Sequence, residues 1–147
     1  MPYTVIRDWL IEHWACQDGL EWFDARCPSG EASVTPEFLR AAMTENLEWV
    51  GWLATRLLSG SKWTEYDMVR NKLRAEYCAD RNKLWDEYRA ACDKLYAERC
   101  ADYELRAKYS AAHDKLYAEH CATRDKLHAA WHVARAEAAI HALCPAD

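Results

Sequence analysis

Hydrophobic residues recur at a helical period over most of the chain, most regularly between Ser61 and Leu143, a stretch without Gly or Pro. From Leu73 to Leu127 the leucines follow one another at intervals of eleven residues with a single interval of ten, and most are followed four positions later by an aromatic residue. At 100° per residue these positions share one face, while the Lys that precedes all but one of these leucines lies on the opposite side. The predicted interaction face consists of Leu73, Tyr77, Leu84, Tyr88, Leu95, Leu105, Tyr109, Leu116, Leu127 and Trp131.

The spacing of the leucines also predicts the course of the helix. Eleven residues in three turns give 3.67 residues per turn, which alone would produce a slight right-handed supercoil. The single ten-residue unit lowers the mean between Leu73 and Leu127 to about 3.60, so the hydrophobic face runs almost straight along an undistorted helix. This hendecad-like pattern predicts one long amphipathic helix over residues 61–144.

The hydrophobic face of such a helix needs a partner, because a module of sixty residues is too small to cover it. A second copy of the chain, a fold-back hairpin or another protein could supply that cover. A homo-oligomeric coiled coil, most simply a two-fold dimer, is the preferred interpretation. The hairpin is the alternative, with its break near Ala101-Asp102-Tyr103 or between Ser110 and Asp114, although neither place has turn chemistry.

Residues 1–60 show shorter helical patterns separated by turn residues. Thr4 is expected to cap a first helix, which Asp18-Gly19 interrupts, and the stretch from Cys27 to Gly30 is a predicted turn. Thr35-Pro36 predicts the start of another helix, and a further helix covers Glu45 to Leu58. No strand is predicted. The fold class is therefore all-α, with a helical module at 1–60 and the repeat helix at 61–144, as a coiled coil or a helical hairpin.

Charge divides between these two segments. Residues 1–60 contain four Arg, no Lys and nine carboxylates, whereas residues 61–147 contain equal numbers of each sign. Glu12, Glu21, Glu45 and Glu48 form the predicted acidic surface, which should attract a basic partner. The absence of a basic stripe argues against direct binding to nucleic acid. With neither a leader-like segment nor a membrane span in this sequence and seven cysteines, the expected location is the cytoplasm, or the host cytoplasm if a phage encodes the chain.

The N-terminal segment carries a recurring pattern of tryptophans with small neighbours. Its members are Trp9-Leu10, Ala15-Cys16, Gly19-Leu20, Trp22, Trp49, Trp52-Leu53 and Arg56. This pattern resembles a small Trp-rich helical module of uncharacterised bacteriophage and bacterial proteins, which a repeat-rich tail often follows. The resemblance covers about the first 58 residues and implies a phage or bacterial accessory protein. It assigns no catalytic or binding residue.

Candidate chemistry is sparse. Cys121, Asp125, His128 and His132 share one side of the helix, but they span about 16 Å of its axis, so only His128 and His132 remain as metal-ligand candidates. Cys16 and His13 are more simply explained as a thiol and a surface imidazole than as a catalytic pair. The tryptophan cluster at positions 9, 14, 22, 49 and 52 is either a small hydrophobic core or an aromatic cage for a ligand, with the core preferred.

These observations favour a non-enzymatic protein that associates with itself, with another protein, or with both. No cofactor, metal, catalytic residue or membrane is expected to take part. The alternative is a phage-encoded inhibitor of a host defence enzyme or nucleic-acid enzyme that acts through the acidic surface.

Overall fold

The computed structural model describes residues 3–101 and 106–145, with side chains at 3–98 and 108–145. Its elements are helices apart from two strands of three residues each, which confirms the all-α class. The chain divides into two compact units, unit 1 with residues 1–71 and 132–147, and unit 2 with residues 72–131. Unit 1 thus contains a C-terminal segment that the sequence-based division at residue 60 placed with the repeat.

Unit 1 begins with a strand, where the sequence predicted a helix. β1 (Thr4–Ile6) pairs antiparallel with β2 (Glu31–Ser33), and Val5 lies opposite Ala32. Val5 is buried between two exposed neighbours, the alternation that a half-buried strand requires. The predictions of a Thr4 cap and of no strand were therefore wrong. A run of three residues is too short for its period to be recognised, and β-branched side chains favour the extended backbone.

The first interruption between helices also differs from the prediction. α1 (Arg7–Glu12) ends in a turn in which Trp14 has a positive φ of 64°, and the Ala15 N–H donates to the Leu10 carbonyl at 2.9 Å. α2 (Gln17–Arg26) then runs straight through Gly19. The break expected at Asp18-Gly19 thus lies earlier, because a glycine inside a helix lowers its stability without ending it. The predicted turn at Cys27–Gly30 is confirmed, with Gly30 at φ 74°.

Two capped helices complete the N-terminal part of unit 1. α3 (Pro36–Glu45) starts as predicted, with the Phe38 N–H donating to the Thr35 hydroxyl at 3.2 Å. Asn46 ends α3 and caps α4 (Leu47–Leu57), its side-chain oxygen accepting from the Glu48 N–H at 2.9 Å. The Asn46 side chain thus allows α3 and α4 to meet at a single residue, because it accepts a hydrogen bond from a backbone N–H that the first turn of α4 leaves unpaired.

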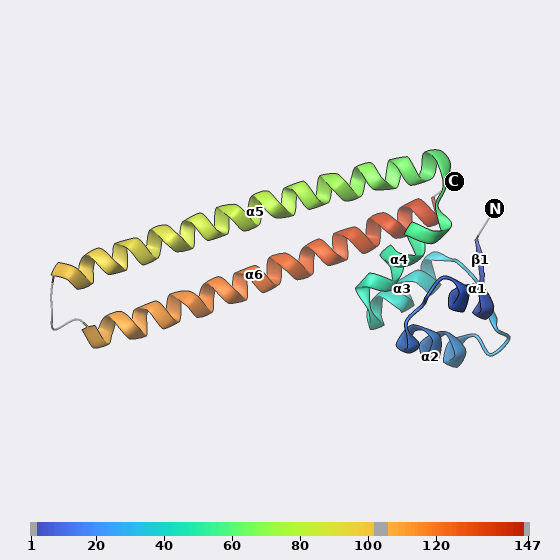
Figure 1. Ribbon diagram of the computed structural model, residues 1–147, viewed down its shortest axis with the longest axis horizontal. Coiled ribbons are helices and arrows are strands. Elements are labelled where there is room, and N and C mark those ends of the chain that lie inside the picture. The colour runs from blue at the N-terminus through green and yellow to red at the C-terminus, as the bar shows by residue number, and fades with distance from the viewer. Residues whose placement is uncertain (1–2, 102–105, 146–147) are drawn as a thin grey trace. The chain divides into compact units, whose positions relative to one another are not determined.

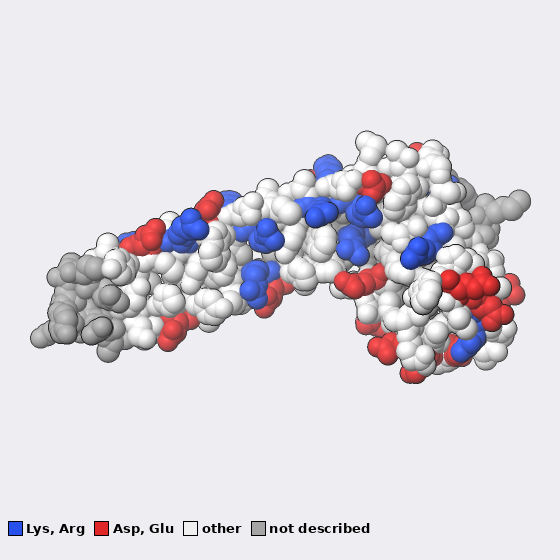
Figure 2. Space-filling model, in the orientation of Figure 1, with Lys and Arg blue, Asp and Glu red and all other residues white. Residues whose placement is uncertain are grey.

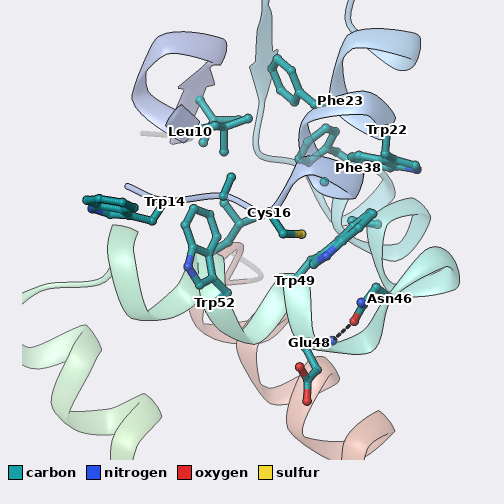
Figure 3. Close-up of a pocket in the computed structure, with 15 residues that line it drawn as sticks. Leu10, Trp14, Cys16, Trp22, Phe23, Phe38, Asn46, Glu48, Trp49 and Trp52 are labelled. Carbon is teal, nitrogen blue, oxygen red and sulfur yellow. Dashed lines mark hydrogen bonds between the residues drawn. The ribbon is translucent and has the colours of Figure 1, made fainter. Parts of the chain in front are cut away.

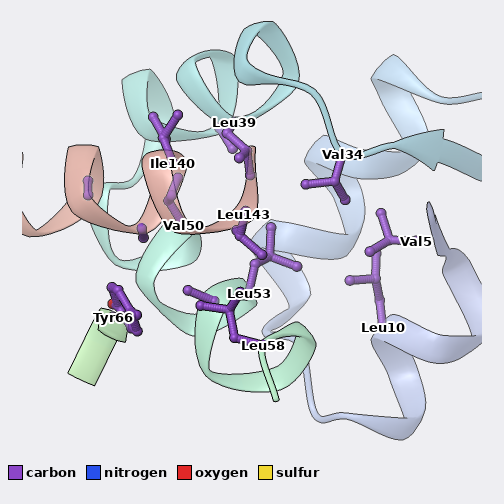
Figure 4. Packing of buried hydrophobic residues seen from close by; sticks show 14 of the residues in the cluster. Val5, Leu10, Val34, Leu39, Val50, Leu53, Leu58, Tyr66, Ile140 and Leu143 are labelled. Atoms are coloured by element: carbon purple, nitrogen blue, oxygen red, sulfur yellow. The ribbon is translucent and has the colours of Figure 1, made fainter. Parts of the chain in front are cut away.

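The core of unit 1 combines both ends of the chain (Figure 4). Leu39 and Val50 from α3 and α4 pack with Ile140 and Leu143, which belong to the end of α6 (Arg106–Leu143). Tyr66, near the start of α5 (Gly60–Ala101), is also buried. The α6 residues that enter the core follow helical spacing, and those fully buried are Ala136, Ala139, Ile140 and Leu143. Unit 1 is therefore closed by the last turns of the repeat segment.

Unit 2 is a helical hairpin made of the central parts of α5 and α6, which run antiparallel (Figure 1). Tyr77 stacks on Trp131 with ring centroids 5.0 Å apart, and Tyr88 lies 4.5 Å from His120. Of the arrangements left open by the sequence, the structure has the hairpin, with α5 ending at Ala101 and α6 starting at Arg106. The predicted break after Ala101 and the predicted face residue Leu105 lie outside the described residues, whereas Ser110–Asp114 is helical.

The hairpin has two unlike faces. Lys–Glu pairs at i and i+4 follow one of them, among them Lys83 with Glu87 and Lys115 with Glu119, each at 3.9 Å. The residues one position after the repeat leucines lie on the other face of the hairpin. When two antiparallel helices pack through their leucines, the residues at this position in both helices fall on the same side of the pair. We call this second surface the aromatic face, defined by Trp85, Tyr96 and Tyr117, which are 48%, 53% and 54% exposed.

None of the helices in the described part of the chain combines the length and the apolar character of a membrane span.

Candidate functional site

Unit 1 contains a cavity of about 260 Å³ between α1, α2, α3 and α4. Its walls are mainly apolar, and four indole rings contribute to them (Figure 3). The lining residues are Val5, Leu10, Trp14, Ala15, Cys16, Gly19, Trp22, Phe23, Phe38, Ala42, Asn46, Glu48, Trp49, Trp52 and Leu53. Trp14, Cys16, Asn46 and Glu48 are exposed, so the cavity opens to solvent beside them.

The inner wall is held by aromatic contacts between α2, α3 and α4. Trp22 lies 5.4 Å from Phe38 and 5.7 Å from Trp49, both in tilted arrangements that suit the ring quadrupoles. The Arg26 guanidinium lies 5.2 Å from the Trp22 ring, and the Arg56 guanidinium lies 6.0 Å from the Trp52 ring. These cation–π contacts help to fix the indoles from outside the cavity.

Gly19 has no side chain, and this keeps part of the cavity beside α2 open. A Cβ placed on Gly19 would lie 3.4 Å from the Cys16 sulfur and 3.6 Å from Trp49 Cε2, which are ordinary contact distances. Because Gly19 lies inside a helix at negative φ, alanine would be tolerated and would favour the helix. The glycine is thus not required by the backbone, and its effect is to keep this part of the cavity open.

Trp14 stands at the edge of the cavity in a costly conformation (Figure 3). A non-glycine residue with positive φ carries conformational strain, and a bulky residue is rarely found there. Its side chain is 87% exposed, so burial of the indole offsets almost none of this conformational strain. A large aromatic ring is therefore held in solvent next to an apolar opening.

The five tryptophans of the predicted cluster divide between the two roles that the sequence left open. Trp22, Trp49 and Trp52 pack against the core and line the cavity, whereas Trp14 is exposed at its edge. Trp9 lies outside the lining and stacks on His13 with centroids 4.1 Å apart. The sequence did not single out Phe38, Gly19 or Asn46 as lining residues. The glycine inside a helical pattern was the available signal, and it was interpreted as a break.

The other predicted chemical groups are engaged elsewhere. The His13 Nδ1 donates to the Trp9 carbonyl at 2.8 Å, while Cys16 contributes to the cavity wall. Asp125 pairs with Arg124 at 2.9 Å, and the His128 ring lies 6.0 Å from Tyr77. Across the described residues, no group of three or more His, Cys, Asp or Glu side chains could hold a metal ion. The six cysteines with described side chains are free thiols, and burial raises the pKa of Cys27 and Cys144.

The predicted acidic surface is exposed on unit 1. Glu12, Glu21, Glu45 and Glu48 are all exposed, and Glu45 lies 3.8 Å from Arg26. Unit 1 has seven Lys or Arg against thirteen Asp or Glu, a net charge of −6, while unit 2 has twelve against eleven. Figure 2 shows carboxylates gathered on the visible side of unit 1 and both signs interleaved along unit 2.

The predicted interaction face of the repeat lies between the two helices of unit 2. Its described members within that unit are all half-buried: Leu73, Tyr77, Leu84, Tyr88, Leu95, Tyr109, Leu116, Leu127 and Trp131. His120 occupies the position four residues after Leu116, where four of the other five repeats carry Tyr or Trp, and it contacts Trp85 and Tyr88. The repeat alignment contained the signal for this ring, which the prediction missed.

No family model, curated protein or solved structure matches the chain.

Proposed function

We propose that the protein is a non-enzymatic oligomerisation and protein-interaction protein, whose hairpin associates with a second copy of itself and so presents the acidic unit 1 in two copies. The observation that carries this proposal is the incomplete burial of unit 2. Among its residues with described side chains, none is buried, although the helices bring their leucines and aromatic rings together. Two helices alone cannot enclose a hydrophobic seam, whereas four helices can.

The aromatic face has the size and composition of a protein interface. Residues 72–98 extend about 40 Å at 1.5 Å per residue, and two helices are about 20 Å wide, so one face covers roughly 800 Å², the usual contribution of one partner. Tyr and Trp are the residue types enriched in such surfaces. Burying the exposed halves of three rings removes about 300 Å² of surface per copy, or about 7 kcal/mol before the costs of association.

The overall charge of the hairpin is compatible with a second copy as the occupant. Unit 2 as a whole is almost neutral, so two hairpins carry little net repulsion. Arg81, Arg89 and Arg124 adjoin Trp85, and Arg124 is paired with Asp125. The repeats also give both helices of the hairpin equivalent surfaces, which suits the two-fold symmetry of a homodimer.

A matched pair of glutamate substitutions tests self-association. Tyr117→Glu places a charge on the aromatic face, whereas Ala118→Glu places the same charge one residue away at an exposed position outside that face. Light scattering coupled to size-exclusion chromatography should show a dimer for wild type and Ala118→Glu and a monomer for Tyr117→Glu. Equal masses for the two variants would contradict the role of the aromatic face.

The charge of unit 1 favours a second candidate function, inhibition of a host defence or nucleic-acid enzyme by a phage-encoded protein. An excess of six carboxylates would steer a basic surface toward the unit at low salt. The resemblance of residues 1–58 to a phage and bacterial module supports the same setting.

Neutral substitutions test this second candidate. Glu12→Gln with Glu21→Gln should weaken the capture of nucleic-acid enzymes from host lysate, whereas Glu76→Gln with Glu87→Gln on the hairpin should not. The Debye length falls from about 14 to about 6 Å between roughly 50 and 300 mM salt, so capture should fall over this range. Binding that is insensitive to both changes would eliminate the acidic surface as the contact.

A further inference from the structure

We propose that the Trp-lined cavity of unit 1 binds a small aromatic molecule that is neutral or cationic, with Trp14 contributing to the site at its entrance. This ligand site is separate from the self-association of the hairpin. Its evidence is the volume of the cavity, the chemistry of its walls and the conformation of Trp14.

The volume indicates the size of the ligand. An apolar cavity of about 150 Å³ holds one benzene molecule, so the cavity of about 260 Å³ has room for two fused rings. It is slightly below the size of typical drug-binding pockets, which begin near 300 Å³. A one-ring or two-ring compound therefore fits inside the cavity, whereas a nucleotide or a larger cofactor would extend out of it.

The walls indicate the ring chemistry. Water needs two to four polar partners to be held well, and the inner wall formed by Leu10, Phe23, Phe38 and Leu53 offers none from its side chains. The indoles of Trp22, Trp49 and Trp52 present flat surfaces suited to a planar ligand, stacked or edge-on. Water in this inner part is thus readily displaced by an aromatic ring.

The charges around the cavity select against anions. Among the described residues that line it there is one carboxylate, Glu48, and no Lys, Arg or His. Arg26 and Arg56 lie over the Trp22 and Trp52 rings from outside the lining. Among the described residues, Trp49 is thus the inner indole without a guanidinium over its face. Unit 1 as a whole has a net charge of −6. Indole faces attract cations because the ring quadrupole is negative at its face. A positively charged nitrogen on the ligand would therefore strengthen binding, and a carboxylate would weaken it.

Trp14 accounts for the specificity of the entrance. Its indole is exposed and its backbone has a positive φ, so burial of this ring contributes little to the folding of unit 1. A ligand that reached the opening would cover the indole and gain contact area. The same ring would then contribute to affinity, in the way that exposed aromatic anchors do in other binding sites.

Three probes with one ring system and different charges test the proposal: indole, tryptamine and indole-3-acetate. Calorimetry and ligand-observed NMR at low salt should show binding of indole and tryptamine, with tryptamine favoured over indole-3-acetate by about tenfold or more, that is 1.4 kcal/mol. The proposal is overturned if neither indole nor tryptamine binds. It is also overturned if indole-3-acetate binds most tightly.

Two variants separate binding in the cavity from binding elsewhere. Gly19→Ala fills part of the cavity and leaves the helix at least as stable, so it should weaken tryptamine binding at least about tenfold while the melting temperature stays the same or rises. Thr44→Ala, at an exposed position of α3 outside the lining, is the control and should bind as wild type does. Unchanged binding by Gly19→Ala would place the probe outside the cavity.

The entrance is tested by Trp14→Asn. Asparagine tolerates positive φ, and the indole it replaces is largely exposed, so the fold should be retained. Tryptamine binding should weaken severalfold, with circular dichroism unchanged. Wild-type affinity in this variant would remove Trp14 from the site.

Discussion

Unit 1 and unit 2 both contain many hydrophobic side chains but bury them to different extents. Unit 1 buries fifteen hydrophobic residues almost completely, drawn from both strands or their flanks, from helices α1 to α4 and from the two ends of the repeat segment. Unit 2, over its described side chains, buries none, although Leu and aromatic residues recur along both helices. A closed core needs elements that approach from several directions, whereas a hairpin of two straight helices leaves its hydrophobic side chains half accessible.

The comparison separates two tasks within one chain. The irregular sequence of unit 1 gives it a core with distinct contacts at each position, together with a cavity and an acidic surface. The repeated sequence of unit 2 gives it a long, uniform, nearly neutral surface that can be extended by whole repeats without changing its chemistry. We therefore expect the stability of unit 1 to be intrinsic and that of unit 2 to depend on association.

The largest effect is expected from removing the C-terminal part of unit 1. A chain that ends at Trp131 lacks Ala136, Ala139, Ile140 and Leu143, so it leaves an open gap in the core against α3 and α4. We expect this chain to lose the tertiary near-UV circular dichroism of its tryptophans. A chain that ends at Cys144 is the control and should keep it. A native-like signal from the shorter chain would show that the rest of unit 1 folds without residues 132–147.

A pair of alanine substitutions measures the contrast between the units directly. Ile140→Ala in the core should cost about 2 to 5 kcal/mol in the free energy of unfolding. Leu84→Ala, at a half-buried position of the hairpin, should cost about 1 kcal/mol in the monomer. Urea unfolding at low and high protein concentration should show that the loss in the free energy of unfolding grows with concentration for Leu84→Ala and stays constant for Ile140→Ala. If the effect of Leu84→Ala on the free energy of unfolding were the same at all protein concentrations, the proposed difference between the two units would be contradicted.

The smallest effect concerns alkaline pH. Burial raises the pKa of Tyr66, and nearby Arg135 and Arg70 oppose this rise in part. Since the raised pKa belongs to the folded state, the contribution to stability is fully present below the ordinary value of about 10 and is lost as pH rises above it. Tyr66→Phe should therefore lose less stability than wild type between about pH 9 and 11 in thermal melts. A parallel decline in the two proteins would contradict this assignment.

The repeat was the most predictable part of the molecule. The eleven-residue spacing identified the helices of unit 2 and the side on which Leu84, Tyr88 and Leu116 meet, because helical period depends only on local geometry. It did not decide between one long helix and a hairpin, since no turn residue marks the end of α5. The choice depends on contacts between distant residues, such as Tyr77 with Trp131.

The parts of unit 1 that escaped prediction also depend on distant contacts. The strand at Val5 exists because β2 pairs with it, and Ile140 is buried because α3 and α4 provide a surface for it. The spacing of Ala136, Ala139, Ile140 and Leu143 indicated a buried helix face, but it followed the repeat and was included in it. The cavity was only partly foreseen, because a cluster of tryptophans indicates a core or a site without distinguishing them.

Sedimentation equilibrium of the full chain tests most directly whether unit 2 is an interface. Measured from about 1 to about 100 µM, a range that covers the dissociation constants of most transient dimers, the mass should rise toward twice 17.1 kDa. The variant Tyr117→Glu should stay at 17.1 kDa over the same range. A wild-type mass of 17.1 kDa at every concentration would contradict the account, because the half-exposed seam of unit 2 would then be stable without a second copy.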